Sequence, residues 1–567
     1  LGAGDTVTLT SLTQLTRARV TISDAASTFS IPALGNIDHT FFNLSGGANL
    51  ALAAANYVGT SFTGGTFFSA DGATTALDLS AMQSIDSAVN HGFAQTRTIA
   101  ATGGGTVDLS NLTTLHGGTV DDTVEIKQTG GGTVMLDNLT TTTGNVRFNT
   151  DVDLTLLNLQ NAGALYFTMQ PGSTLELPAL ISQTGGSYAL PAGGTVNTPN
   201  LASAAGTTIN ISDGTATFSA PALGNIDNGL VNVSGGAQFA LPSILNYTGT
   251  DIVSGTFFSA AGAGTLLDLS ALESIDSAVN HGFARTRTIS ATEGGTIDLS
   301  AVNTLRGGTG DDTLRVAVSS SGTIDMSGLQ SVSTGNVRFD VDAEGTLLLG
   351  DFTVTGNTAF NINDVTSVVD VAGSLLLDSP SAFNVATGGG LSVGGNFSFA
   401  ITDETAFNSS SGILVMDGAG TFANPQFLEV GGSDAGLGDP GNNGNFGLGQ
   451  LVIGTDAQPT VVSLLDVIDN GNRASPEALY LYGLGGPDGL LLRGGSTLVI
   501  DNIPVYAWIN GDWMKLNDLF TGGVTQVDFA AITNTPGDSG FVVIPEPASI
   551  ALLAIGGGLL ASRIRRR

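Results

Sequence analysis

The four histidines are the first residues to consider for catalysis. They are His39, His91, His116 and His281, and none of them is spaced for a metal pair. The sequence also lacks a Gly-x-Ser-x-Gly nucleophile turn and a His-Glu-x-x-His helix. The residue types therefore predict a protein that is not an enzyme.

One combination of carboxylate, imidazole and guanidinium nevertheless occurs twice in the chain. Its members are Asp86, His91 and Arg97, repeated as Asp276, His281 and Arg287. Polysaccharide-cleaving β-helices use clustered carboxylates with Arg or Lys on one face, whereas this chain has only two lysines, Lys127 and Lys515. A duplication that copied all residues alike is the favoured explanation. A carbohydrate-binding or polysaccharide-degrading β-helix protein remains the alternative.

A second candidate is a calcium site in a glycine-rich turn. Residues 307–314 read GGTGDDTL, which resembles the RTX nonapeptide, in which glycine carbonyls and an aspartate hold a hard cation. The resemblance implies Asp311 and Asp312 as ligands. The equivalent earlier segment departs from the motif at Val120, so an ordinary acidic turn is the other interpretation.

Repeated aromatic residues form a third candidate, a ligand face. Tyr57 and Phe93 recur as Tyr247 and Phe283, and aromatic rows beside polar groups can contact sugars. The alternative is that these rings fill a widened core.

The elements that carry these residues are predicted from two levels of repetition. Residues 29–118 and 218–308 run in parallel, and a shorter unit recurs about every 20 to 30 residues, as expected of solenoids. Within each unit, apolar residues alternate with period two between glycine-rich turns, which predicts strands. We expect an all-β protein, an elongated parallel β-solenoid. A leucine-rich repeat is the runner-up, because the Leu-x-x-Leu spacing is shared.

The same pattern suggests five regions along the chain. They are a duplicated solenoid over 1–352, degenerate β repeats over 353–430, a Gly/Asn-rich linker over 431–449, a small C-terminal β region over 450–541, and a tail over 542–567.

Composition narrows the class of partner. The 567 residues include 80 Gly and no Cys, and the formal net charge is -32. Such acidity repels nucleic acid, so we exclude nucleic-acid binding. A hydrophobic content of 41% argues against disorder.

The tail has three parts in a fixed order. Pro545, Glu546 and Pro547 precede an apolar run over 548–561, which ends in a basic cluster. That cluster consists of Arg563, Arg565, Arg566 and Arg567. The apolar run is predicted to be a C-terminal hydrophobic helix, shorter than the roughly 20 residues of a comfortable transmembrane span. The arginines place the rest of the chain on the outer side of the membrane.

This tail resembles the PEP-CTERM sorting signal. The resemblance implies cleavage by an exosortase at the inner membrane of a Gram-negative type of cell, and association with exopolysaccharide. No charged-then-apolar leader follows Leu1, so any signal peptide is expected either to have been removed or to lie outside this sequence. The sequence thus predicts an exported structural or adhesive protein of the cell surface or extracellular matrix, inserted transiently in the inner membrane. It predicts no cofactor other than the candidate calcium.

Overall fold

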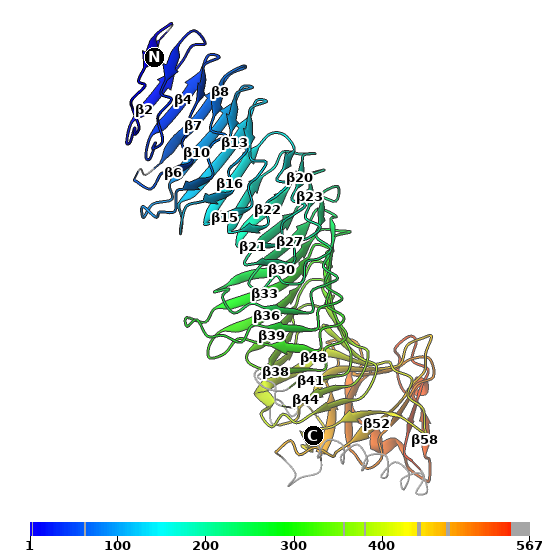
Figure 1. Ribbon diagram of the computed structural model, residues 1–567. Helices are drawn as coiled ribbons and strands as arrows, with labels where there is room; N and C mark the ends of the chain where they lie inside the picture. The colour runs from blue at the N-terminus through cyan, green and yellow to red at the C-terminus, as the bar shows by residue number, and fades with distance from the viewer. Residues whose placement is uncertain are drawn as a thin grey trace. The chain divides into compact units, whose positions relative to one another are not determined.

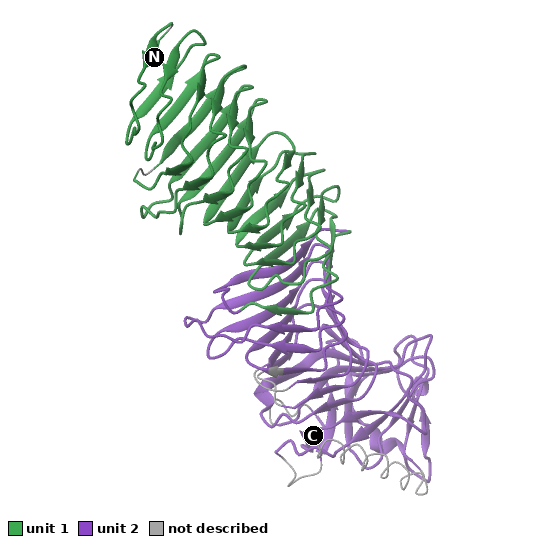
Figure 2. Cartoon of the chain, viewed as in Figure 1, with its two compact units in different colours: residues 1–249, 264–268 green, residues 250–263, 269–567 purple. Residues whose placement is uncertain are grey.

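A computed structural model describes most of the chain. The described residues are 1–2, 4–61, 64–354, 358–378, 382–438, 444–471 and 477–545. Their regular structure is almost entirely β, so the all-β prediction is confirmed. The chain forms two compact units, residues 1–249 with 264–268 and residues 250–263 with 269–567 (Figure 2).

Unit 1 is built from stacks of parallel strands, each strand contributed by a successive coil of the chain (Figure 1). The first stack contains β2 (Arg19–Ile22), β4 (Phe41–Ser45), β7 (Gly65–Asp71), β10 (Thr96–Thr102), β13 (Thr123–Thr129), β16 (Asn145–Thr150), β19 (Ala164–Thr168), β22 (Gly186–Leu190), β25 (Thr208–Ile211) and β27 (Leu230–Ser234).

The other faces of unit 1 consist of shorter strands. One four-stranded stack contains β5 (Asn49–Ala51), β8 (Ala76–Asp78), β11 (Thr106–Asp108) and β14 (Thr133–Met135), and another contains β17 (Leu154–Thr155), β20 (Thr174–Glu176), β23 (Thr195–Asn197) and β26 (Thr217–Ser219). Strand β28 (Gln238–Ala240) pairs in parallel with β31 (Leu266–Asp268). A seven-stranded stack contains β6 (Asn56–Val58), β9 (Ser84–Asp86), β12 (Thr114–His116), β15 (Thr141–Thr143), β18 (Asn161–Ala162), β21 (Ser182–Thr184) and β24 (Ser203–Ala205), and β29 (Asn246–Thr248) lies outside it. In addition, β1 (Thr6–Thr8) pairs with β3 (Thr28–Ser30).

Unit 2 has the same parallel architecture. One stack contains β30 (Gly255–Ala261), β33 (Thr286–Thr292), β36 (Thr313–Val318), β39 (Val337–Val341), β42 (Thr358–Ile362) and β45 (Ala382–Val385). A second contains β34 (Thr296–Asp298), β37 (Thr323–Met326), β40 (Thr346–Leu349), β43 (Val368–Val371), β46 (Gly390–Val393) and β48 (Phe407–Met416). A third contains β32 (Ser274–Asp276), β35 (Thr304–Arg306), β38 (Ser331–Thr334), β41 (Phe352–Val354), β44 (Leu375–Leu377), β47 (Phe397–Phe399) and β49 (Gln426–Glu429). This stacking of parallel strands is the arrangement of a parallel β-helix.

The predicted C-terminal β region continues these stacks. It contains β51 (Leu448–Ile453), β52 (Val461–Leu465), β53 (Glu477–Leu481), β54 (Leu490–Leu492), β55 (Thr497–Val499), β56 (Val505–Ile509), β57 (Asp512–Lys515), β58 (Gln526–Asp528) and β59 (Phe541–Val543). Strand β51 pairs in parallel with β48 and β54, whereas β57 and β58 pair antiparallel with β56 and β59. The region is therefore part of the stacked body of unit 2.

The described part of 431–449 is not an extended linker. It contains β50 (Gly432–Ser433) and the start of β51, and Asn445 and Phe446 are buried. The Glu404 carboxylate accepts hydrogen bonds from the backbone N–H groups of Gly444, Asn445 and Phe446, at 2.6, 3.0 and 3.1 Å. These contacts dock the segment against its own unit, which composition alone did not indicate.

The leucine-rich alternative does not describe the fold. Such a repeat places a helix or a 3₁₀ turn in each unit. In the described residues the 3₁₀ helices are η1 (Glu404–Ala406), η2 (Leu516–Leu519) and η3 (Phe529–Ala531), all beyond the duplicated region. None of the described helices is long and apolar enough to cross a membrane. The predicted hydrophobic helix lies outside the described residues.

The core follows from the period-two alternation. Inward residues of the first stack stand in register from coil to coil, as with Ile99, Ile126 and Phe148, each at most 1% exposed. Because side chains at equivalent positions of neighbouring coils lie one strand spacing apart, ~4.8 Å, aromatic rings stack along unit 1. Ring centroids are 5.3 Å apart for Phe148 and Phe167, and 5.4 Å for Phe167 and Tyr188.

Candidate functional site

The repeated polar cluster centres on a buried arginine. In unit 2 the guanidinium of Arg287, on β33, is 0% exposed. Its Nε donates to the Ser277 hydroxyl at 2.5 Å, and its Nη2 donates to the Ser277 carbonyl at 2.9 Å. Its Nη1 donates to Asp312 Oδ2 at 3.2 Å. A buried arginine is tolerated because these acceptors replace water around its donors.

Asp312 is the centre of this cluster. Its carboxylate is also 0% exposed and accepts hydrogen bonds from the backbone N–H groups of His281 and Arg285, at 2.9 and 3.0 Å. The His281 Nδ1 lies 3.3 Å from Asp312 Oδ2. Burial alone would raise the pKa of Asp312, but the hydrogen bonds from His281, Arg285 and Arg287 outweigh it, and the pKa lies below its ordinary value of 3.8.

The copy in unit 1 has the same members but looser contacts to its arginine. His91 Nδ1 lies 2.9 Å from Asp122 Oδ2, and the Gln95 N–H donates to Asp122 Oδ1 at 3.1 Å. The Arg97 Nη1 is 3.6 Å from Asp122, and within the described residues none of its three guanidinium nitrogens has a hydrogen-bond partner. Burial lowers the pKa of Arg97, against the opposing effects of Asp122 and Tyr57.

The cluster positions a loop. The two loops 87–95 and 277–285 join β9 to β10 and β32 to β33. In each loop, two backbone N–H groups donate to one buried aspartate of the following coil, 27 and 31 residues away. Each loop is therefore clamped to the following coil through one buried carboxylate.

The sequence named the wrong carboxylates for this cluster. Asp86 and Asp276 do not contact the histidine: each accepts from the backbone N–H two residues on, at 3.0 and 2.9 Å, and Asp276 pairs with Arg306 at 2.7 Å. The carboxylates that do join it are Asp122 and Asp312, which come from the following coil. The repetition of Asp122 as Asp312 was the available signal for this role.

The calcium interpretation of Asp311 and Asp312 gains no support from these contacts. Asp312 is engaged with Arg287, and Asp311 Oδ2 accepts from the Ala284 N–H at 2.9 Å. Another group, Glu429, Asp466 and Glu477, places one oxygen of each carboxylate within 4.8 Å of the others. Carboxylate oxygens are the ligands that calcium prefers, so this group is a second candidate for a hard cation, in which Glu429 Oε1 already accepts from the Val467 and Ile468 N–H groups at 2.7 and 2.6 Å.

The predicted ligand face divides into buried and exposed residues. Tyr57 and Tyr247 are each 1% exposed, and their hydroxyls donate to the carbonyls of Thr40 and Gly229, at 3.3 and 2.9 Å. They belong to the core, and the Tyr57 ring lies 5.3 Å from the Phe67 ring and 4.8 Å from the Phe68 ring, centroid to centroid. Phe93 and Phe283 are 76% and 85% exposed on the clamped loops.

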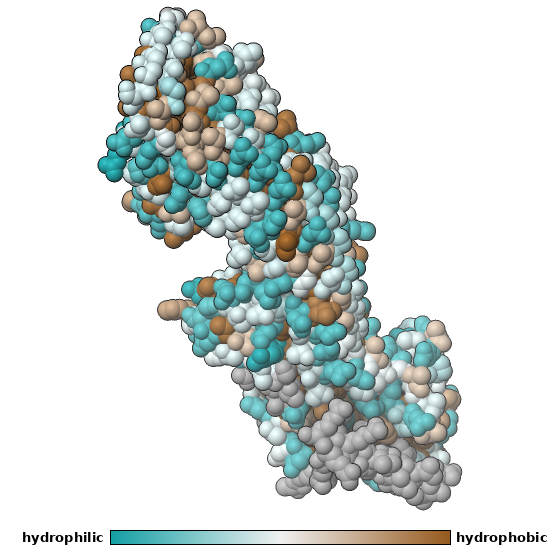
Figure 3. Space-filling model, in the orientation of Figure 1, coloured by the Kyte–Doolittle hydropathy of each residue, from teal (hydrophilic) through white to brown (hydrophobic). Residues whose placement is uncertain are grey.

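Figure 3 shows hydrophilic residues over much of the face in view, with hydrophobic ones in small groups. The Arg285 guanidinium lies 5.8 Å from the centre of the Phe283 ring. An exposed ring next to a cation on a held loop can contact a partner.

Of the sorting motif, only Pro545 lies within the described residues. Glu546, Pro547 and the four tail arginines lie outside them. Comparison of the chain with protein-family models, curated proteins and solved structures finds no match.

Proposed function

We propose that this chain is an exported structural or adhesive protein of the cell surface or extracellular matrix, sorted through a cleavable C-terminal signal. An exosortase is the proposed partner at the inner membrane, and exopolysaccharide is a candidate matrix ligand. The main support is that the body is a stack of parallel strands whose repeated His-Asp-Arg clusters are engaged in holding loops. These buried polar groups hold the fold together, and the surface of the body is available for contact with partners.

The order of motif, apolar run and arginines supports the sorting step. The apolar run of 548–561 is short for a permanent anchor, and arginines at its end favour the cytoplasmic side. Transient insertion followed by release accounts for both features.

The test is intact-mass analysis of the full chain recovered from its host, with and without the exosortase, from membrane and extracellular fractions. We expect a mass that ends near Pro545 in the extracellular fraction, only when the enzyme is present. A Glu546→Ala variant should retain Arg567 and stay in the membrane fraction, whereas Asp538→Asn is the matched control and should be cleaved normally. Enzyme-independent retention of Arg567 by the natural chain would refute cleavage.

The exposed loops favour one alternative, a carbohydrate-binding body. Phe93 and Phe283 are held on equivalent loops and are accessible. Replacing both by Ser should weaken retention of the protein on isolated matrix polysaccharide if the loops bind it. Unchanged retention would leave the loops without a role in sugar binding.

A further inference from the structure

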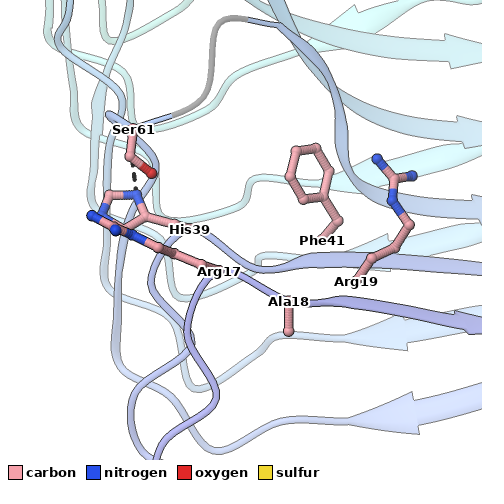
Figure 4. A pocket seen from close by; sticks show the side chains of 6 residues that line it. All are labelled: Arg17, Ala18, Arg19, His39, Phe41 and Ser61. Carbon is pink, nitrogen blue, oxygen red and sulfur yellow. Dashed lines mark hydrogen bonds between the residues drawn. The ribbon is translucent and has the colours of Figure 1, made fainter.

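An open depression in unit 1 gathers cationic side chains in an otherwise acidic protein. It has a volume of about 520 Å³ and is lined by Arg17, Ala18, Arg19, His39, Phe41 and Ser61 (Figure 4). The whole chain carries a formal charge of -32. A local positive field on such a background singles out this place for an anion.

The two arginines have donors available for a ligand. Arg17 and Arg19 are exposed, and among the described residues neither side chain forms an ion pair or donates a hydrogen bond. The Arg19 guanidinium carbon lies 4.5 Å from the centre of the Phe41 ring. Stacking uses the flat face of the guanidinium and leaves its in-plane N–H groups free to bind a carboxylate.

The backbone at this depression adopts a costly conformation. Arg17 and His39 have φ values of 56° and 60°, in the left-handed region, which Asn, Asp and His enter more often than other non-glycine residues, so the cost falls mainly on Arg17. The Arg17 N–H donates to the Asp38 carbonyl at 3.1 Å, and the His39 N–H donates to the Val58 carbonyl at 2.8 Å. These bonds hold both residues in place.

The alignment of the two repeat copies continues upstream of residue 29, with residues 1–28 facing 190–217, and the second copy builds the same turns without that cost. Gly206 and Asn228 stand at the equivalent positions, with φ values of 68° and 57°. Their N–H groups make the equivalent bonds, to Asp227 at 2.8 Å and to Thr248 at 2.7 Å. The fold itself therefore does not require Arg or His at these positions.

The difference between the copies extends to the whole lining. The pairs are Arg17 and Gly206, Arg19 and Thr208, His39 and Asn228, and Phe41 and Leu230. Strain that the architecture can avoid, together with cationic and aromatic side chains confined to one copy, indicates a binding role for the first copy.

We propose that this depression binds a carboxylate-bearing sugar, as two consecutive residues of an acidic polysaccharide. The Arg17 and Arg19 guanidinium groups point to opposite ends of the depression, one beside His39 and the other beyond Phe41 (Figure 4), so each pairs with the carboxylate of a different sugar residue. His39 supplies a polar edge to the hydroxyls; its Nδ1 accepts from the Ser61 N–H at 3.3 Å, which orients the ring. The volume suits a ligand of sugar size, whereas a small inorganic anion would fill little of it. This inference concerns the body of the chain and does not depend on cleavage of the tail.

The experiment is titration of the purified full chain with trigalacturonate at low salt, followed by calorimetry. Cellotriose and inorganic phosphate serve as the neutral and the small-anion probes. We expect trigalacturonate to bind, and the other two probes to bind at least about tenfold more weakly. Cellotriose lacks the carboxylates that the arginines would pair with, and phosphate lacks the sugar ring. Equal binding of phosphate or cellotriose would overturn the assignment.

The variants come from the second copy itself. Arg17→Gly with Arg19→Thr should weaken trigalacturonate binding at least about tenfold. Arg17→Gly and His39→Asn should not lower the unfolding temperature, since both introduce residues that the same turn already accepts. Arg147→Thr on β16 removes one charge elsewhere in unit 1 and should bind as the natural chain does. Natural affinity in the double variant would refute the proposal.

Discussion

The two buried arginines differ in how well their donors are used. Arg287 donates to Ser277 and Asp312, whereas Arg97 comes no closer than 3.6 Å to Asp122 and has no hydrogen-bond partner among the described residues. A buried cation stabilises a fold only when its desolvation is offset by such contacts. The same residue type is therefore expected to contribute unequally in the two copies.

Arg287→Met is predicted to lower the free energy of unfolding by about 3–5 kcal/mol, because it leaves Asp312 buried without its counter-ion. Arg97→Met is expected to cost less than about half of that, since it removes a cation whose burial is poorly compensated. Denaturant unfolding of both variants measures the difference. Equal losses would contradict the proposed distinction between the two clusters.

The Asp312 carboxylate also predicts a pH dependence. Its folded-state pKa lies below 3.8, so its stabilising contribution is full above that value and is lost as the pH falls through the folded-state pKa. We expect Asp312→Asn to be less stable than the natural chain at neutral pH. The gap should narrow below pH 3.8, as followed by hydrogen exchange of the 281–285 backbone. A gap that stays constant with pH would rule out this linkage.

At the scale of the element, the stacked coils approach closely at their glycine turns. Gly131 and Gly132 join β13 to β14, and each has a different constraint. Gly131 has φ of 78° and open space around it, whereas a Cβ on Gly132 would overlap the carbonyl of Ala101 on the preceding coil. Gly131 is therefore required because its φ strains any other residue, and Gly132 because a side chain would not fit against the preceding coil.

Alanine at these two positions should separate the two constraints. Gly131→Ala is expected to cost about 1 kcal/mol of unfolding free energy through left-handed strain. Gly132→Ala should cost about 3 kcal/mol, because the coils must move apart. Thermal unfolding of the matched pair provides the measurement, and a larger loss for Gly131→Ala would reverse the assignment.

At the scale of the whole molecule, the net charge of -32 opposes folding by self-repulsion. Salt screens this repulsion, so the unfolding temperature should rise between about 10 mM and about 500 mM sodium chloride. Falling stability would show that attractive ion pairs outweigh the repulsion.

Calcium chloride at equal ionic strength is the informative comparison. A further rise that disappears in Glu429→Gln would locate a bound ion at the Glu429, Asp466 and Glu477 group. A rise lost in Asp311→Asn would instead support the RTX-like turn.

Much of the architecture was predictable because strand formation is local. Alternation of apolar and polar residues between glycine turns sets which side chains point inward, and this pattern can be read within each coil. The parallel stacks, with inward residues such as Ile99 and Ile126 in register, follow that pattern. The docking of residues 444–446 was not predictable in this way, because it depends on the Glu404 carboxylate, which lies 40 or more residues earlier in the chain.

The sites depended on contacts between coils, which local patterns do not specify. His91 meets Asp122 and not Asp86, because the carboxylate that reaches it lies 31 residues along the chain, on the next coil. Tyr57 is buried against Phe67 and Phe68 of the next strand, although its spacing alone allowed a surface face. The sequence by itself determined the alternation, the duplication and the tail motif; only the tertiary structure, through the register between coils, decided which polar groups meet.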